Sequence, residues 1–269
     1  MKIIALLVHD DEGQDARLAV ALDLARAVNG HLSCIEIAVP EPVGVPFGGV
    51  ASVLTVAELE REGANRSRIE ARLEAELVST DWIEMVGDIA TSLVQVSALA
   101  DLIVLDQDVE RLRPSHVSSA ASEVLVRTGR PILAVSAQTR GFDAGGHALI
   151  AWDGSASAVA AMRAAVPLLR RAHAVTLVEL DDGSVTIPAD DAAVYLARHG
   201  ILATVQAERP LRETAGDALL ERVRRLRASY CVMGAFGHSR VRERLFGGVT
   251  RTMLASCPVP LLLVHAATA

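Results

Sequence analysis

The sequence predicts an α/β protein built from two tandem, doubly wound sheets of five parallel strands each. Three observations support this: an internal duplication, short apolar runs that alternate with helical segments, and a composition of 51% hydrophobic but only 3% aromatic residues. A core of Ala, Val, Leu and Ile is typical of parallel sheets covered by helices on both faces. The 269 residues suffice for two domains, since domains cluster near about 100 to 150 residues.

The duplication becomes visible when the sequence is shifted along itself. A shift of 143 residues brings HLSCIEI (31–37) within HAVTLVEL (173–180), with Ser33 over Thr176, and brings Asp10 onto Asp153. Near the end of each half the best shift is 129, which sets Pro131 over Pro260. The extra residues of the first half point to the Pro- and Gly-rich stretch 39–52, which its composition predicts to be a loop or lid. We expect domains at 1–138 and 146–269.

Each half alternates strands with helices in the same order. In the first half we expect strands at about 2–8, 31–38, 82–87, 101–105 and 131–136. In the second half we expect strands at about 148–152, 174–180, 201–206, 230–233 and 260–265, and helices near 156–172, 188–199, 214–228 and 247–256. Strands joined through helices form right-handed βαβ crossovers and hence a parallel sheet. The segment 136–147 is the expected linker.

Charge and composition argue against several classes of partner. Lys and Arg number 26 against 33 Asp and Glu, a net charge of −7, which disfavours nucleic acid. The start of the chain lacks a signal-peptide pattern, and no apolar run is long enough to span a bilayer. Three distant cysteines and the histidine spacing predict no metal site. We therefore expect a cytoplasmic protein without a membrane or nucleic-acid partner, and the basic run 221–227 to be a solvated helix face.

The stretch GAFGHSRVRERLFGGVT, 234–250, carries the strongest functional signal. It follows the fourth strand of the second half at the sheet edge where ligands bind in doubly wound folds, and it leads into a helix. Free amides at a helix N-terminus suit an anion such as phosphate. Glycines allow the backbone to approach such a group closely, and a hydroxyl follows them; these positions are Gly234, Gly237, Gly247, Gly248 and Thr250. The alternative is that the glycines only form a turn and a cap.

Together with IAWDGS and CPVPLLLV, this stretch resembles the universal stress protein (UspA-type) family, whose ATP-binding members carry two glycines three residues apart, nine further residues and then Gly. The resemblance covers the second half and, more weakly, the first. It implies a five-stranded parallel sheet with four helices, an ATP or AMP site in some members, pairing through the last strand and a stress-linked role.

By position, the resemblance implies particular site residues in the second half. Asp153 corresponds to the residue near the adenosine, although a plain turn or N-cap is the alternative. Ala151 and Leu180 would contact the base, with Met233 behind it. The phosphate loop and helix start would be Gly234, Gly237, Gly247, Gly248, Val249 and Thr250. His238 and Arg240 either face the phosphates or stay solvated. Gly248 stands where ATP-binding members often have Ser, which implies an altered phosphate contact.

The first half lacks these glycines. The shift of 129 sets Leu105 over Gly234, Asp108 over Gly237, and Ser118 and Ser119 over Gly247 and Gly248. We expect no nucleotide triphosphate to bind there in the usual mode, because an acidic residue would repel phosphate. Asp10 persists, so a different ligand under the 39–52 loop and a purely packing role are both open. By analogy with family dimers, 131–136 and 260–265 are expected to pair and form an intramolecular pseudo-dimer; a further homodimer is open.

The leading hypothesis is a nucleotide-dependent stress-response or regulatory binding protein with ATP or AMP, with or without Mg²⁺, in its second half and an unidentified protein partner. A slow ATPase or phosphotransferase is the first alternative, although no Lys of the Walker type follows the glycines and no paired acids suit Mg²⁺. We expect no catalytic residues. The second alternative is a binding module for a non-nucleotide ligand in the first half.

Overall fold

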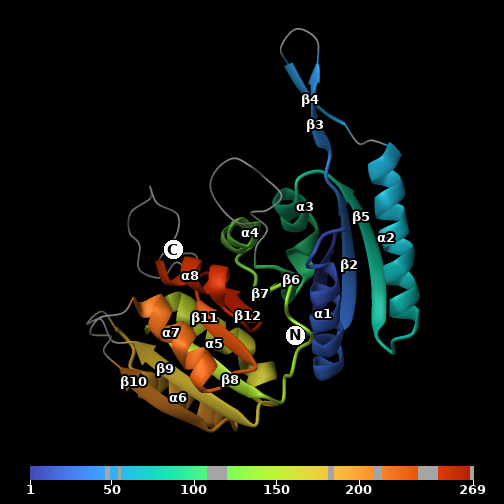
Figure 1. The fold of residues 1–269 in the computed structure, drawn as a ribbon. Coiled ribbons are helices and arrows are strands. Elements are labelled where there is room, and N and C mark those ends of the chain that lie inside the picture. Colours follow the sequence, from blue (N-terminus) through green and yellow to red (C-terminus); the bar gives the residue numbers. More distant parts are fainter. Residues whose placement is uncertain are drawn as a thin grey trace.

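The computed structural model describes residues 1–45, 49–53, 56–107, 120–180, 185–208, 214–235 and 248–266. Its main sheet has ten strands in the order β10-β9-β8-β11-β12-β7-β6-β1-β2-β5. Each half contributes five of these strands, and Figure 1 shows the two halves side by side. The predicted α/β class with parallel sheets is confirmed, because every pairing within each half of this sheet is parallel.

The first half forms its sheet from five of its strands and covers it with helices. The sheet strands are β1 (Ile3–Val8), β2 (His31–Ala38), β5 (Ser79–Val86), β6 (Leu102–Asp106) and β7 (Ile132–Val135). The helices are α1 (Gln14–Val28), α2 (Val56–Glu74), α3 (Ile89–Val96), a short 3-10 turn (Ser97–Leu99) and α4 (Ala120–Thr128). The sheet strands lie within about three residues of their predicted ranges.

The second half repeats this order. Its strands are β8 (His147–Trp152), β9 (Ala174–Leu180), β10 (Ala203–Glu208), β11 (Tyr230–Gly234) and β12 (Leu261–Val264). Its helices are α5 (Ala156–Leu169), α6 (Ala189–Arg198), α7 (Ala215–Arg225) and α8 (Gly248–Ser256). In both halves the first strand lies between the second and the fourth, so the chain reverses its direction of progress across the sheet at that strand.

The prediction of a loop at 39–52 is wrong. This stretch forms an antiparallel hairpin of β3 (Glu41–Val45) and β4 (Gly49–Val53), in which Val43 pairs with Ala51. Figure 1 shows it projecting from the body of the first half. Both strands of a two-stranded ribbon are edges, where Pro and Gly are tolerated, so the Pro- and Gly-rich composition did not prevent strand formation. A role as a lid stays a prediction.

The two halves meet through their last strands. β7 and β12 pair antiparallel, with Leu133 opposite Leu262 and Ile132 opposite Leu263. This is the predicted pairing of 131–136 with 260–265. Both strands are fully buried or nearly so, and the pairing removes one exposed edge from each half.

Alternating side chains divide the core into two layers, one on each face of the sheet. Ile4, Leu6 and Val8 face the layer that contains α1, α2, α5 and α6, whereas Ala5 and Leu7 face α3, α4, α7 and α8. This two-residue alternation is the geometry of a strand buried on both faces. Within the described ranges, no helix has the length and apolar character needed to cross a bilayer.

Candidate functional site

The predicted nucleotide site lies where the second half changes direction. β8 is flanked by β9 and β11, and the carboxyl ends of these parallel strands meet at one edge of the sheet. Ala151 is the register partner of Met233, Asp153 follows β8, and Leu180 is the last residue of β9. Ligands of doubly wound sheets bind at such a switch point. The fold therefore gathers residues from three distant segments, as expected.

One side of this edge is apolar. Met233 is buried, while Ala151 and Val249 are half-buried and pack against the same hydrophobic cluster. Val249 comes from the first turn of α8, so the cluster connects the ends of β8 and β11 to that helix. Apolar walls with a few polar groups are typical of small-molecule sites.

Asp153 has a structural role in the turn after β8. Its Oδ1 accepts a hydrogen bond from the Ser155 backbone N at 2.9 Å. Ser155 is the N-cap of α5, and its hydroxyl oxygen accepts from Ala158 N at 3.1 Å. Gly154 between them has φ of 70°, which favours glycine. The turn that formed the alternative interpretation of Asp153 is therefore present, and contact with adenosine stays a prediction.

Gly234 is required by packing. A Cβ at this position would come within 2.6 Å of the Ser157 carbonyl carbon and would also overlap the Ala158 backbone N. The N-terminal turn of α5 therefore crosses the end of β11 at a distance that only glycine permits. This contact accounts for the glycine without a ligand, and its proposed approach to phosphate remains a hypothesis.

The start of α8 provides the helix N-terminus that the sequence predicted. Gly248 is exposed, and a Cβ added there would meet no heavy atom within 4 Å, whereas Thr250 is 3% exposed. A close contact between Gly216 and Thr252 holds α8 against α7. Of the other predicted site residues, Gly237, His238 and Gly247 lie outside the described residues, as does Arg240.

The corresponding edge of the first half is filled by an arginine that sequence reasoning missed. Arg17 on α1 is fully buried. Its guanidinium donates to Asp11 Oδ1 and Oδ2 at 2.8 and 2.9 Å, to the Leu7 and His9 carbonyls at 3.1 Å each, and to the carboxylate of Asp106. A buried charge needs such compensation. A signal was present, since Arg17 shares helical spacing with the buried Ala21 and Leu24 and so falls on the apolar face of α1.

The structure also corrects the alignment of the two halves at this edge. The sequence shift set Leu105 over Gly234, but Leu105 lies in the core layer that contains Met233. Asp106 pairs with Val135 of β7 as Gly234 pairs with Val264 of β12. Side chains alternate along a strand, so Asp106 is the counterpart of Gly234. Asp108, Ser118 and Ser119 lie outside the described residues.

A second glycine accommodates Asp106. A Cβ on Gly13, just before α1, would overlap the Asp106 carboxylate. The second half thus has its glycine on the strand and the first half has its glycine beside the helix. Burial raises the pKa of Asp106 to about 6, against the opposing charge of Arg17. A carboxylate at this position would oppose a bound phosphate.

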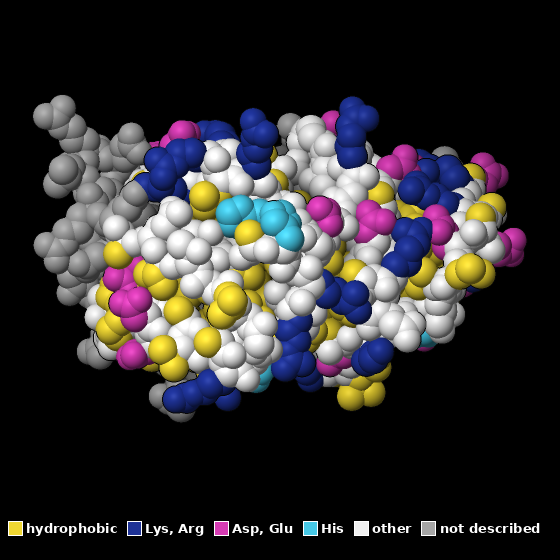
Figure 2. All heavy atoms as spheres, turned by 90° about the horizontal axis from the view of Figure 1, so that it is seen from below, with side chains coloured by type: hydrophobic (Ala, Val, Ile, Leu, Met, Phe, Trp, Pro, Cys, Tyr) yellow, Lys and Arg dark blue, Asp and Glu magenta, His cyan; other side chains and the backbone are white. Residues whose placement is uncertain are grey.

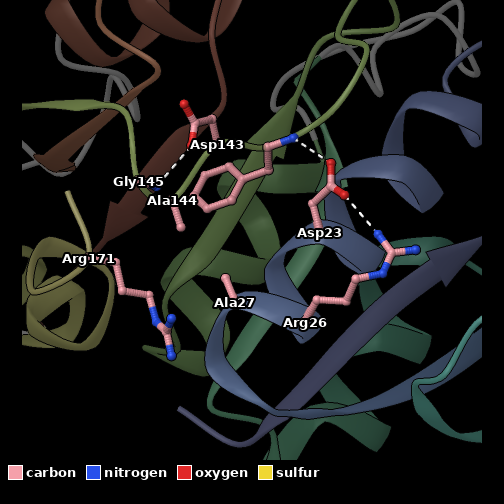
Figure 3. Close-up of a pocket in the computed structure, with 8 residues that line it drawn as sticks. Asp23, Arg26, Ala27, Asp143, Ala144, Gly145 and Arg171 are labelled. Carbon is pink, nitrogen blue, oxygen red and sulfur yellow. Dashed lines mark hydrogen bonds and ion pairs between the residues drawn. The ribbon is translucent and has the colours of Figure 1, made fainter. Parts of the chain in front are cut away.

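One surface pocket formed by described residues lies at the opposite edge of the sheet. It has a volume of about 450 Å³, and Figure 3 shows Arg26 and Arg171 on opposite sides of it, with Ala27 between them. Its lining comes from the carboxyl end of α1, from 142–145 before β8 and from Arg171 after α5, which is the amino edge of the strands. None of the predicted site residues lines it.

Charges around this pocket are mixed. Asp23 accepts from Arg26 Nη1 and from Phe142 N, both at 2.9 Å. On the face shown in Figure 2, Lys and Arg side chains lie among Asp and Glu side chains. Across the described residues, no group of three or more His, Cys, Asp and Glu side chains is arranged to hold a metal ion.

Comparisons with known proteins show the fold. No protein-family profile and no curated protein matches the sequence. Among solved structures, a universal stress protein from Archaeoglobus fulgidus DSM 4304 aligns over 98% of this chain and 96% of its own, with a TM-score of 0.72 and 16% identity. A functionally unknown protein from Pseudomonas aeruginosa PAO1 aligns over 98% of this chain and 92% of its own, with a TM-score of 0.63 and 15% identity. This chain therefore has the universal stress protein fold, with two five-stranded halves joined in one polypeptide.

Proposed function

We propose that the second half binds one adenine nucleotide, ATP or AMP, and that its occupancy controls how the chain engages a protein partner. The observation that carries this proposal is the convergence of Ala151, Asp153 and Met233 with the start of α8 at the switch point of the sheet. These residues come from separate segments of the chain, and the resemblance to the universal stress protein family implies Ala151, Asp153 and Met233 as site residues.

The residues present suit the parts of a nucleotide. Ala151, Met233 and Val249 supply an apolar wall for a base. The Asp153 carboxylate lies just beyond the end of β8, where a hydrogen-bond acceptor suits a ribose hydroxyl. The exposed Gly248 opens the N-terminus of α8 to an anion, where free amides and the helix dipole favour phosphate.

Metal ions would be bound mainly through the nucleotide. In the part of the chain that the structure describes, no cluster of acidic or histidine side chains forms a metal site, so any Mg²⁺ would depend on phosphate oxygens for its ligands. The chain itself would contribute binding and orientation of the nucleotide rather than a catalytic group.

The contrast between the halves predicts a stoichiometry of one. In the first half Asp106 stands where the second has Gly234, and Arg17 fills the adjoining edge. A phosphate there would meet a carboxylate, whereas Gly234 presents no side chain. One nucleotide per chain is therefore expected.

Isothermal titration calorimetry with ATP and with AMP tests the proposal. We expect one site per chain, and Gly237→Asp should weaken ATP binding at least about tenfold, equivalent to about 1.4 kcal/mol, because it places a carboxylate beside the phosphates. Val194→Asp on the exposed face of α6 makes the same charge change away from the edge and should bind normally. No heat of binding up to millimolar nucleotide would refute the proposal.

A further inference from the structure

Helix α2 contacts the first half in two different ways. In its second part, Ile69 is fully buried and Leu73 nearly so, both within the core. In its first part, charged side chains reach the carboxyl edge of the sheet: Arg61 Nε lies 3.4 Å from Asp10 Oδ2, and Glu62 Oε1 lies 3.1 Å from His9 Nδ1. The first part is thus held by charge and the second by apolar packing. Figure 1 shows α2 running along the outer side of the first half.

Glu62 contacts the counterpart of a proposed ligand contact. Leu6 pairs with Val104 as Ile150 pairs with Val232, each two residues before the matched Asp106 and Gly234. His9, one residue beyond β1, therefore corresponds to Asp153, one residue beyond β8. In the second half Asp153 is proposed to contact a nucleotide, whereas in the first half Glu62 contacts this position and Arg61 contacts the adjacent Asp10.

The contact between His9 and Glu62 is buried on both sides. His9 is 6% exposed and Glu62 is 5% exposed. Besides Glu62, the Ile37 carbonyl lies 3.1 Å from His9 Nδ1. Both neighbours accept hydrogen bonds, so Nδ1 carries a proton. Glu62 Oε2 has no hydrogen-bond partner among the described residues, which makes this carboxylate depend on His9 for compensation.

Several other charged groups face this pair. Asp11 in the turn after β1, Arg17 on α1 and Asp106 on β6 act on His9, while Glu36 on β2 faces Glu62. Burial lowers the pKa of His9, but the hydrogen bond and charge of Glu62 and the charge of Asp11 raise it, against Arg17, and it lies above its ordinary value.

We propose that Arg61 and Glu62 occupy the ligand edge of the first half in place of a ligand. Protonated His9 holds them there through Glu62, and this contact is called the latch. The first part of α2 therefore loosens as the pH rises. The comparison with Asp153 rests on the proposed function, whereas the docking of α2 and its pH dependence do not. The proposal assigns α2 an intramolecular contact at this edge with a pH-dependent strength.

The direction of the pH effect follows from proton linkage. A histidine whose pKa is raised when α2 contacts the edge stabilises this docked state fully below the ordinary pKa of histidine. The contribution is lost as the pH rises through the pKa that the histidine has in the docked state. Docking should therefore be stronger near about pH 6 than near about pH 8.

Hydrogen exchange of the full chain, read by mass spectrometry at both pH values and corrected for intrinsic rates, tests the latch. Peptides around Arg61 and Glu62 should be severalfold better protected at the lower pH, because docking then gains the positive charge of His9. Peptides around Ile69 and Leu73 should change little. His9→Gln should abolish the pH dependence. His31→Gln is the matched control, because His31 pairs with Asp81 at the opposite end of β2, and it should retain the wild-type response.

Two results would overturn the proposal: equal protection of the Arg61–Glu62 segment at both pH values in the wild-type chain, or a wild-type pH response in His9→Gln. If His9→Gln does not fold, Glu62→Gln replaces it. This variant keeps a hydrogen-bond acceptor for His9 but removes the negative charge, so it must also lose the pH response. A retained response in Glu62→Gln contradicts the latch.

Discussion

Gly234 and Asp106 occupy matching strand ends in the two halves, but the space beside them is filled in different ways. At Gly234 the strand has no side chain and the backbone of α5 approaches it directly. At Asp106 the strand carries a carboxylate, Gly13 makes room for it, and Arg17 neutralises it. The same strand end is therefore packed against helix backbone in the second half and filled by an ion pair in the first half.

Gly234→Ala should destabilise the protein by about 1–3 kcal/mol, because the new methyl group overlaps the Ser157–Ala158 backbone and forces α5 away from β11. Urea unfolding monitored by circular dichroism measures this free energy. Gly248→Ala is the control, since the space around Gly248 is open; its effect should stay within about 0.5 kcal/mol. Equal effects of the two substitutions would mean that α5 does not constrain Gly234.

Arg17→Met should cost about 3–5 kcal/mol of unfolding free energy, because it leaves the Asp11 and Asp106 carboxylates buried without compensation. Urea unfolding at neutral pH measures the loss. Arg26→Met removes an arginine that is 44% exposed and should cost at most about 1 kcal/mol.

Adding Asp106→Asn to Arg17→Met should recover part of the lost stability, since one uncompensated charge is then removed. A double-mutant cycle gives the coupling energy between Arg17 and Asp106. A coupling near zero would show that Arg17 does not stabilise the fold through Asp106.

At the scale of helices and strands, the turn from β8 into α5 supports both the packing and the proposed site. Ser155 caps the helix, Asp153 braces the turn, and Trp152 Nε1 donates to the Ile187 carbonyl at 2.8 Å. Gly154 closes the turn against the same segment, because a Cβ there would come within 2.7 Å of Ile187 N. The N-terminal turn of α5 is therefore fixed from several directions.

Ser155→Ala should cost about 1 kcal/mol, because the Ala158 amide loses its capping acceptor in a buried position. Thermal or urea unfolding measures this loss. Ser155→Asn keeps an acceptor and should retain most of the stability. A neutral effect of Ser155→Ala would mean that another group caps α5.

Prediction from sequence succeeded where periodicity decides the structure. Apolar runs such as those around Leu6 and Val232 are buried on both faces of the sheet, and such runs indicate parallel strands regardless of distant contacts. The 41–53 hairpin was missed because Pro and Gly there outweighed the valines in the composition. Arg17 was missed because its partner Asp106 is 89 residues away, a separation at which charge pairing leaves no local pattern.

The candidate site, like the fold, was predicted from the sequence only in part. The strand ends and the start of α8 follow from the duplication and the fold, whereas Ala151 and Met233 were named as site residues through the resemblance to the universal stress protein family. The packing reason for Gly234 could not be predicted, because it depends on the crossing distance between α5 and β11. A sequence shift alone also placed Leu105, rather than Asp106, opposite this glycine.

At the scale of the whole molecule, β7 and β12 join the halves into one sheet. Leu133 and Leu262 face each other at this seam and are fully buried. Phe142 in the linker packs on Tyr230 of β11 with ring centroids 5.2 Å apart. Stability of either half therefore depends on the other.

Leu133→Asp should destabilise the chain by more than about 3 kcal/mol, since it buries an unpaired charge at the seam. Tryptophan fluorescence tests the coupling of the halves, because Trp82 lies in the first half and Trp152 in the second. As the chain unfolds, both tryptophans should lose their native emission in one transition. Val86→Asp on the outer edge, where Val86 is 63% exposed, should change stability by at most about 0.5 kcal/mol. Separate transitions for the two tryptophans would contradict coupling through the seam.

The most direct test of the central claim is native mass spectrometry of the full chain with added ATP and AMP, followed by denaturation to identify what is released. The account predicts one adenine nucleotide per chain, retained by Arg17→Met if that variant folds and lost by Gly237→Asp. Two nucleotides per chain, or one that Gly237→Asp still holds, would contradict a single site in the second half.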